Sequence, residues 1–161
     1  MRFPPMKLVF VEKDRAEEIA RLALNLMEEI HARTGREIIA PNLVQTTRLC
    51  KNFLTKGQYN IAAAIAEDAI VGFGSLCESH SLYAEGTFGI LQELYVLPEY
   101  RSQGVGAKLL EKIVEFARKK GWRRLELATP PLPEFDGAVR FYEQNGFEIT
   151  SGRKLRRLID G

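Results

Sequence analysis

The chain has 161 residues, of which 45% are hydrophobic and 27% are charged, a length and composition typical of one globular domain with a sizeable core. The formal net charge of +2 argues neither for nor against a nucleic-acid partner, and no apolar run approaches the roughly 20 residues of a membrane span. Cys50 and Cys77 are too few for a disulfide framework, and residues 1–5 lack the apolar segment of a signal peptide. These features predict a single cytoplasmic domain over residues 1–161.

A strand and a helix are predicted at the start of the chain. Residues 6–12 are rich in apolar and β-branched side chains and read as a strand. Apolar residues then recur at helical spacing over residues 19–30. Asp14, followed by Glu17 three residues later, predicts a capping box at the start of this helix. We expect the helix to end at Gly35.

A second helix and a β-hairpin are predicted next. Pro41 can open this helix, and Gly57 can stop it. Two extended runs, Tyr59–Glu67 and Ala69–Glu78, follow with a very short connection between them. This spacing predicts a hairpin. Residues 79–86 are polar and read as a loop.

The second half of the chain predicts strands that alternate with helices. The expected elements are a strand over residues 88–97, a helix over 105–120, a strand over 123–129, a helix over 136–144, and two closing strands over 147–150 and 154–159. Asp136 is expected to cap the last helix. The resulting order, β-α-α-β-β-β-α-β-α-β-β, predicts an α/β fold in which helices cover a mixed sheet.

The junction between the strand at 88–97 and the helix at 105–120 predicts an anion-binding site. A helix N-terminus carries unpaired N–H groups and a partial positive charge. Gly104 and Gly106 leave its backbone open to a ligand, because glycine has no Cβ. With the charge of Arg101 nearby, the site would suit a pyrophosphate, although neither the P-loop nor the dinucleotide-binding pattern is present. The alternative is that the two glycines only allow tight packing of strand and helix.

The hexapeptide RSQGVG, Arg101–Gly106, resembles the Q/R-x-x-G-x-G/A signature of the GNAT-type N-acetyltransferase superfamily. The preceding LYVLPEY and the later AVRFYEQNGF are similar to that family's fourth strand and to its last helix with the following strand. The expected element order resembles the family over nearly the whole chain. The resemblance implies an acyltransferase whose central sheet is mixed, mostly antiparallel and flanked by helices.

The resemblance also implies acetyl-CoA as the anionic co-substrate. Its pyrophosphate would lie on the start of the helix, and its pantetheine arm would run beside the preceding strand. The implied cofactor-binding residues are Leu94, Tyr95, Val96, Arg101, Ser102, Gln103, Gly104, Val105, Gly106, Ala107 and Lys108. The chain departs from the family at Phe135, where many members have an Asn that contacts the pantetheine.

Two catalytic residues are implied by the same resemblance. Tyr142, in FYEQNGF, matches the family's tyrosine that donates a proton to the thioester sulfur; the alternative is a core aromatic. Glu93 stands where some relatives carry an acidic residue that binds or deprotonates the amine; the alternative is an exposed strand residue. The backbone N–H of Leu94 or Val96 would polarise the thioester carbonyl. No spacing of His, Cys and Asp indicates a metal site.

The implied function is acetyl transfer to a primary amine of a small molecule. The alternatives are a protein lysine or N-terminal acceptor and, in a different class, a non-catalytic acetyl-CoA sensor. Tyr142 favours an enzyme, because a sensor needs no acid. The acceptor would lie against the helices within residues 14–56 and the loop at 79–86. The basic runs at 118–124 and 153–157 read as solvated faces, so neither a nucleic acid nor a membrane is an expected partner; monomer and homodimer both stay open.

Overall fold

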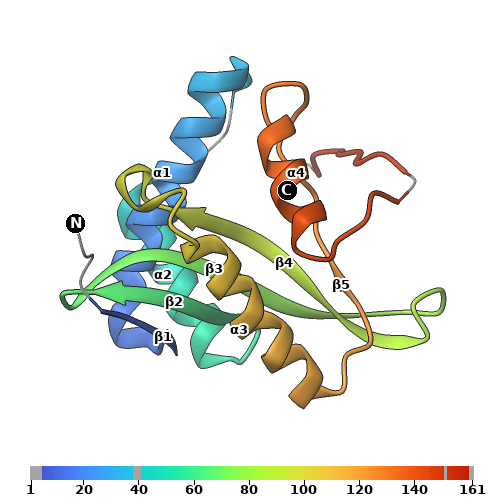
Figure 1. Ribbon diagram of the computed structural model, residues 1–161, viewed down its shortest axis with the longest axis horizontal. Helices are drawn as coiled ribbons and strands as arrows, with labels where there is room; N and C mark the ends of the chain where they lie inside the picture. The colour runs from blue at the N-terminus through green and yellow to red at the C-terminus, as the bar shows by residue number, and fades with distance from the viewer. Residues whose placement is uncertain (1–4, 38–40, 151, 160–161) are drawn as a thin grey trace. The chain divides into compact units, whose positions relative to one another are not determined.

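The computed structural model describes residues 5–37, 41–150 and 152–159 (Figure 1). The chain divides into two compact units, the first ending at Leu127 and the second beginning at Ala128. The expectation of one domain over residues 1–161 stays a prediction.

A five-stranded mixed sheet, in the order β1-β2-β3-β4-β5, forms the centre of the first unit. The strands are β1 (Met6–Phe10), β2 (Asn60–Ala66), β3 (Ala69–Ser81), β4 (Gly86–Val96) and β5 (Leu125–Glu126). Neighbours among the first four strands pair antiparallel, whereas β4 and β5 pair parallel. The predicted mixed, mostly antiparallel sheet is therefore confirmed.

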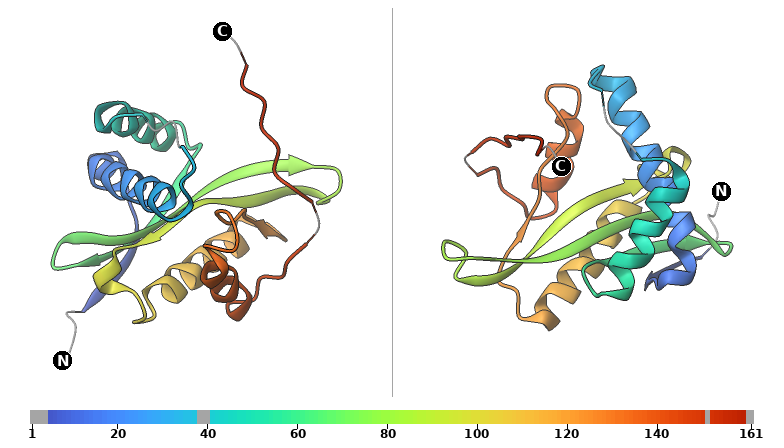
Figure 2. Two further views of the ribbon diagram at one scale, coloured as in Figure 1. Left: turned by 90° about the horizontal axis from the view of Figure 1, so that it is seen from above. Right: turned by 180° about the vertical axis from the view of Figure 1, so that it is seen from behind.

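Helices cover both faces of this sheet. The helical elements are η1 (Lys13–Arg15), α1 (Ala16–Thr34), α2 (Leu43–Thr55), η2 (Pro98–Tyr100) and α3 (Val105–Lys120). Helices α1 and α2 lie on one face, and α3 lies on the other (Figure 2). In the described part of the chain no helix is long and apolar enough to cross a membrane.

The two faces of the sheet pack in different ways. On the α1 side, large side chains such as Phe73 and Tyr95 are buried in one cluster with Ile19 of α1. On the α3 side, Gly74 leaves room for a helix side chain, because a Cβ at this position would lie 2.7 Å from Ile113 Cδ1. Helix α3 therefore packs closely against this face of the sheet.

The starts of α1 and α2 differ from the prediction. Asp14 and Glu17 form no capping box, because the chain enters α1 through the turn η1 and no side chain caps either element. The capping box lies instead at α2, where Gln45 N donates to Asn42 Oδ1 at 2.9 Å and Asn42 N donates to Gln45 Oε1 at 3.1 Å. This helix begins at Leu43, directly after its N-cap Asn42, and not at Pro41.

The two hairpins of the sheet have different lengths from those expected. The β2–β3 hairpin is confirmed, with Glu67 (φ 51°) and Asp68 (φ 65°) both in the left-handed region that a two-residue turn requires. The predicted loop at 79–86 is wrong over much of its length, because β3 and β4 remain paired up to Ser81 and Gly86. This pairing extends the hairpin well beyond the helices (Figure 1).

The second unit contains helix α4 (Asp136–Gln144). Its N-cap residue is Phe135, so Asp136 is the first helical residue and not the predicted cap. The helix ends at Gln144, and the side chain of its C-cap residue, Asn145, donates to Phe141 O at 2.8 Å. The closing strands predicted at 147–150 and 154–159 are wrong, because the described backbone of these ranges pairs with no strand.

Candidate active site

The N-terminus of α3 presents backbone N–H groups that are not used by the fold. Gly104 caps the helix with φ 81°, and a Cβ added there would have no heavy atom within 4 Å. Lys108 N donates to Gly104 O at 3.0 Å, which is the first bond of the helix. The N–H groups from Gly104 to Ala107 have no backbone acceptor among the described residues. They can therefore bind an anion, whereas the N–H of Lys108 is already engaged.

One edge of β4 is open close to this helix start. Strand β5 pairs only with Gly89 and Ile90 of β4. A β-bulge then follows at Gln92, because Glu93 lies opposite Ser75 while Leu91 lies opposite the next residue of β3. Beyond the bulge, β4 pairs with β3 alone in the described part of the sheet.

The direction of the backbone groups on this edge follows from the pairing with β3. Leu97 N donates to Val71 O at 2.9 Å, so it points toward β3. Because backbone groups alternate along a strand, those of Leu94 and Val96 point toward the open edge. Val96 O accepts a bond from Arg101 Nε at 2.8 Å. The N–H groups of Leu94 and Val96 and the carbonyl of Leu94 are left to meet a ligand.

The side chain of Glu93 is held by two hydroxyl groups. Ser75 Oγ donates to Glu93 Oε2, and Tyr59 OH lies 3.1 Å from each carboxylate oxygen. Ser75 Oγ also accepts from Glu93 N at 3.0 Å and is fully buried. Glu93 is itself partly buried, which rules out the exposed strand residue considered as its alternative.

Burial decides the protonation behaviour of this cluster. Burial raises the pKa of Glu93, while the hydrogen bonds from Ser75 and Tyr59 act against that rise. Burial, together with the charge of Glu93, also raises the pKa of Tyr59, so its hydroxyl stays a donor. A carboxylate with a raised pKa is a better base toward an ammonium group than an ordinary exposed one.

Two cavities border Tyr59. The cavity between α2 and the end of β3, of about 370 Å³, is lined by Phe53, Gly57, Gln58, Tyr59, Cys77, Glu78 and His80. The other, of about 390 Å³, lies at the end of β1 and is lined by Phe10, Val11, Glu12, Lys13, Leu54, Thr55, Gly57, Tyr59, Asn60 and Ile61. Both are lined in part by residues from the last turn of α2.

The structure places the other predicted cofactor residues in different surroundings. The side chain of Tyr95 is buried in the core, and its backbone faces β3. The Val105 side chain is also buried. Gln103 Nε2 donates to Glu99 O at 3.0 Å, and Ser102 has φ 62°. These residues shape the turn before α3 more than they present side chains to a ligand.

Tyr142 and Phe135 belong to the second unit. The Tyr142 ring packs edge-on against Phe141 and Phe147, with centroids 5.3 and 5.5 Å away. Burial raises the pKa of Tyr142 to about 12, so the phenol stays protonated at neutral pH. Phe135 is 5% exposed. The catalytic role of Tyr142 stays a prediction.

Glu29 is a residue that the sequence did not single out. Its carboxylate forms a two-point ion pair with Arg101, although the two residues are 72 positions apart. No spacing or motif connects α1 with the turn before α3, so only the folded chain reveals this pair.

Comparison with known proteins identifies the family. The model of the acetyltransferase (GNAT) domain matches residues 57–149, more than half of the chain. The chain therefore belongs to the GNAT acetyltransferase domain family. The matched region contains β2 to β4, α3, β5 and α4.

Individual relatives match shorter parts of the chain. A thialysine N-epsilon-acetyltransferase of Bos taurus is 42% identical over 59 residues, which cover 37% of this chain and 34% of that protein. An uncharacterized N-acetyltransferase of Archaeoglobus fulgidus is 34% identical over 79 residues, covering 48% of this chain and 53% of the relative. The matches thus span between about a third and about half of these relatives.

A solved structure supports the fold. An aminoglycoside N-acetyltransferase in complex with CoA superposes with a TM-score of 0.79 at 20% identity, covering 98% of this chain and 97% of that one. At this identity the similarity establishes the fold alone.

Proposed function

We propose that the chain is an acetyl-CoA-dependent N-acetyltransferase that acts on a primary amine of a small molecule. The observation that carries the proposal is the sequence of features along one continuous segment. Glu93 begins it, the open edge at Leu94 and Val96 follows, and the free N–H groups at Gly104–Ala107 end it. The proposed base, the backbone groups for the pantetheine arm and the N–H groups for the pyrophosphate thus follow one another closely along the first unit.

The residues at these positions fit acetyl-CoA. The helix start offers unbonded N–H groups to a pyrophosphate, and Gly104 adds no side chain that would block it. The backbone groups of Leu94 and Val96 can bond the amides of an extended pantetheine arm as an added strand would. Acetyl-CoA supplies the thioester acetyl group.

The proposed chemistry assigns each proton to a residue of the chain. Glu93 takes a proton from the amine, whose nitrogen forms a C–N bond to the acetyl carbon as the C–S bond breaks. The N–H of Leu94 or Val96 stabilises the charge that builds on the acetyl oxygen. Tyr142 donates a proton to the departing sulfur. Glu93 then releases its proton to water, and Tyr142 regains one from water. The products are an acetamide and free CoA.

A small-molecule acceptor is supported by the cavities and by the names of relatives. The cavity of about 370 Å³ next to Tyr59 has aromatic walls in Phe53 and Tyr59. Such a wall suits a cationic amine. Thialysine and aminoglycosides, named for two similar proteins, both carry primary amines.

A thiol-release assay tests the proposal. Purified protein with acetyl-CoA is presented in turn with diamines, amino acids, aminoglycosides and peptides, and free CoA is measured. We expect release above the hydrolysis rate with at least one small amine. Release with peptides alone would favour a protein acceptor. Tight acetyl-CoA binding without release for any amine would favour the sensor and overturn the catalytic proposal.

A further inference from the structure

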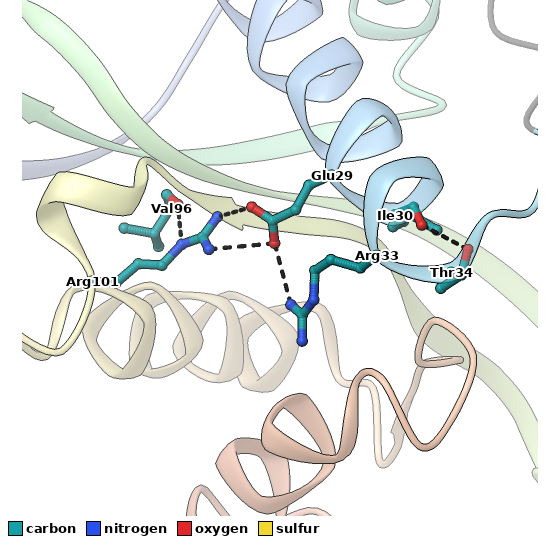
Figure 3. Close-up of polar contacts among 6 residues, drawn as sticks. All are labelled: Glu29, Ile30, Arg33, Thr34, Val96 and Arg101. Carbon is teal, nitrogen blue, oxygen red and sulfur yellow. Dashed lines mark hydrogen bonds and ion pairs between the residues drawn. The ribbon is translucent and has the colours of Figure 1, made fainter.

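The guanidinium group of Arg101 is bound by the carboxylate of Glu29 and by the backbone carbonyl of Val96 (Figure 3). Its Nη2 lies 2.7 Å from Glu29 Oε1, and its Nη1 lies 3.3 Å from Glu29 Oε2. Its Nε donates to Val96 O at 2.8 Å. The group also lies 5.3 Å from the centroid of the Tyr95 ring. The side chain is thus fixed in orientation as well as in position.

These contacts join three elements that meet at the proposed acetyl-CoA site. Glu29 comes from α1, Val96 ends β4, and Arg101 begins the turn that leads to α3. Arg33 approaches Glu29 Oε2 from the next turn of α1, at 3.5 Å. The side chain of Glu29 is 22% exposed and that of Arg101 is 38% exposed, so the ion pair lies at the surface of the first unit.

The geometry gives Arg101 a structural role apart from any contact with an anion. A bidentate carboxylate neutralises the guanidinium and engages one N–H on each of its terminal nitrogens. Nε is spent on a backbone carbonyl at the open edge, which leaves one N–H on each terminal nitrogen. What the side chain supplies is a fixed distance between the end of β4 and the turn before α3.

We propose that Glu29 is a positioning residue for acetyl-CoA binding, which acts by holding Arg101 against Val96 O. This inference rests on the proposed function for its ligand. The contacts among Glu29, Arg101 and Val96 form a clamp. This clamp fixes the N–H groups at the open edge of β4 relative to the N–H groups at the start of α3, so that a pantetheine arm and a pyrophosphate can be bound together. Glu29 itself does not touch the ligand.

The direction in which one substitution changes the affinity for acetyl-CoA distinguishes this positioning role from a purely electrostatic one. Glu29→Gln removes a negative charge near an anion site and frees Arg101. If Arg101 acted through its charge, acetyl-CoA would bind as well or better. If the clamp fixes the position of the β4 edge relative to the start of α3, acetyl-CoA binding weakens although the site has become more positive.

Calorimetric titration with acetyl-CoA measures this change in affinity. We expect affinity to fall about tenfold in Glu29→Gln, in Arg101→Gln and in the double variant alike, because all three lose the same clamp. Arg101→Lys keeps the charge but not the fork and should lose as much as Arg101→Gln. Glu17→Gln, which breaks the exposed Glu17–Arg21 pair on the same helix, is the control and should bind normally. Unchanged or higher affinity in Glu29→Gln would overturn the proposal.

Hydrogen exchange of the ligand-free proteins gives a second readout, which does not depend on acetyl-CoA. Exchange at residues 96–107 should be faster in Glu29→Gln than in wild type or Glu17→Gln. If exchange is unchanged, no clamp exists, whatever the ligand. If wild type does not bind acetyl-CoA, the proposed function fails while the exchange still judges the clamp. Faster exchange with full affinity would disprove its link to binding.

Discussion

The hydroxyl of Tyr59 lies 3.1 Å from each carboxylate oxygen of Glu93. Tyr59 stands just before β2 and Glu93 lies on β4, so the bond spans the width of β3. Ser75 of β3 fills the gap and bonds the same carboxylate. Burial and these two donors act in opposite directions on the pKa of Glu93, and burial is the stronger. The carboxylate is thus held in place and made more basic.

Glu93→Gln should lower kcat/KM most at low pH. There the amine is mostly protonated and depends on a base, whereas at high pH free amine becomes available and part of the loss is recovered. The measurement is kcat/KM from about pH 6 to about pH 9 in a thiol-release assay. Glu115→Gln, which removes an exposed carboxylate on α3, is the matched control. A variant with the wild-type pH profile would assign the base to another residue.

The same substitution should also change how stability depends on pH. The folded-state pKa of Glu93 lies above the ordinary value of 4.5, so the folded protein binds more protons than the unfolded chain in this range. Wild-type stability from this group is therefore lost as the pH rises from 4.5 through the folded pKa. The Glu93→Gln variant does not lose this stability, so its free energy of unfolding should increase relative to that of the wild type over the same rise in pH. Urea unfolding at several pH values measures the difference; a gain by wild type instead would mean that the hydroxyl donors outweigh burial.

Gly104→Val should weaken acetyl-CoA binding at least about tenfold, about 1.4 kcal/mol. The valine must adopt the φ of 81° at the helix cap and would place its branches where the ligand approaches, although no protein atom lies within 4 Å of its Cβ. Gly121→Val is a close control, because Gly121 caps the other end of α3 with φ 75° and equally open space. Titration of both variants separates backbone strain from loss of the site. Equal affinity of the two variants would contradict the assignment of this turn.

Gly89→Ala should destabilise the junction of β4 and β5 by about 1–3 kcal/mol. The new Cβ would overlap the Trp122 ring and lie 2.8 Å from Leu125 Cδ2. The ring is not free to move, because Trp122 Nε1 donates to Glu78 Oε2 at 2.9 Å. In contrast, Gly137→Ala adds a Cβ 3.7 Å from its nearest neighbour within α4 and should be neutral or stabilising. Thermal unfolding compares the two; a Gly89→Ala variant as stable as wild type would show that the ring gives way.

Tyr142→Phe should lower kcat about 10–100-fold and leave acetyl-CoA affinity nearly unchanged. The ring contacts with Phe141 and Phe147 remain, so the fold of α4 should survive. The raised pKa of about 12 keeps the wild-type phenol protonated and able to donate as charge builds on sulfur. Single-turnover kinetics give the chemical step. A rate within about twofold of wild type would make Tyr142 a packing residue.

Features that depend on a few neighbouring residues could be predicted from the sequence. The bounds of α3 follow from apolar periodicity between two glycines, and Gly121 has the positive φ that a helix C-terminus favours. The β2–β3 hairpin follows from two extended runs and a two-residue turn. The unbonded N–H groups at the start of α3 belong to this class as well, because they are part of the backbone of one short segment; that they bind an anion stays a prediction.

Local patterns were also misleading where partners were missing or unexpected. Asp14 and Glu17 have the spacing of a capping box, yet the chain forms a turn there, and the box lies at Asn42 and Gln45. The range 154–159 has strand-like residues but pairs with no described strand. Extended residues form a strand only when a neighbouring strand accepts their hydrogen bonds, and sequence does not report that neighbour.

The sequence by itself determined the fold class, the helix that starts at Gly104 and the residue types at the site. Only the tertiary structure decided what those side chains touch. Glu93 meets Tyr59, 34 positions away, because the bulge in β4 sets the register that turns it toward α2. Arg101 is bound by Glu29, 72 positions away, because α1 packs across the end of β4. Helix periodicity depends on residues that are close in the sequence. Contacts between distant side chains depend on strand register and packing, which exist only once the chain has folded.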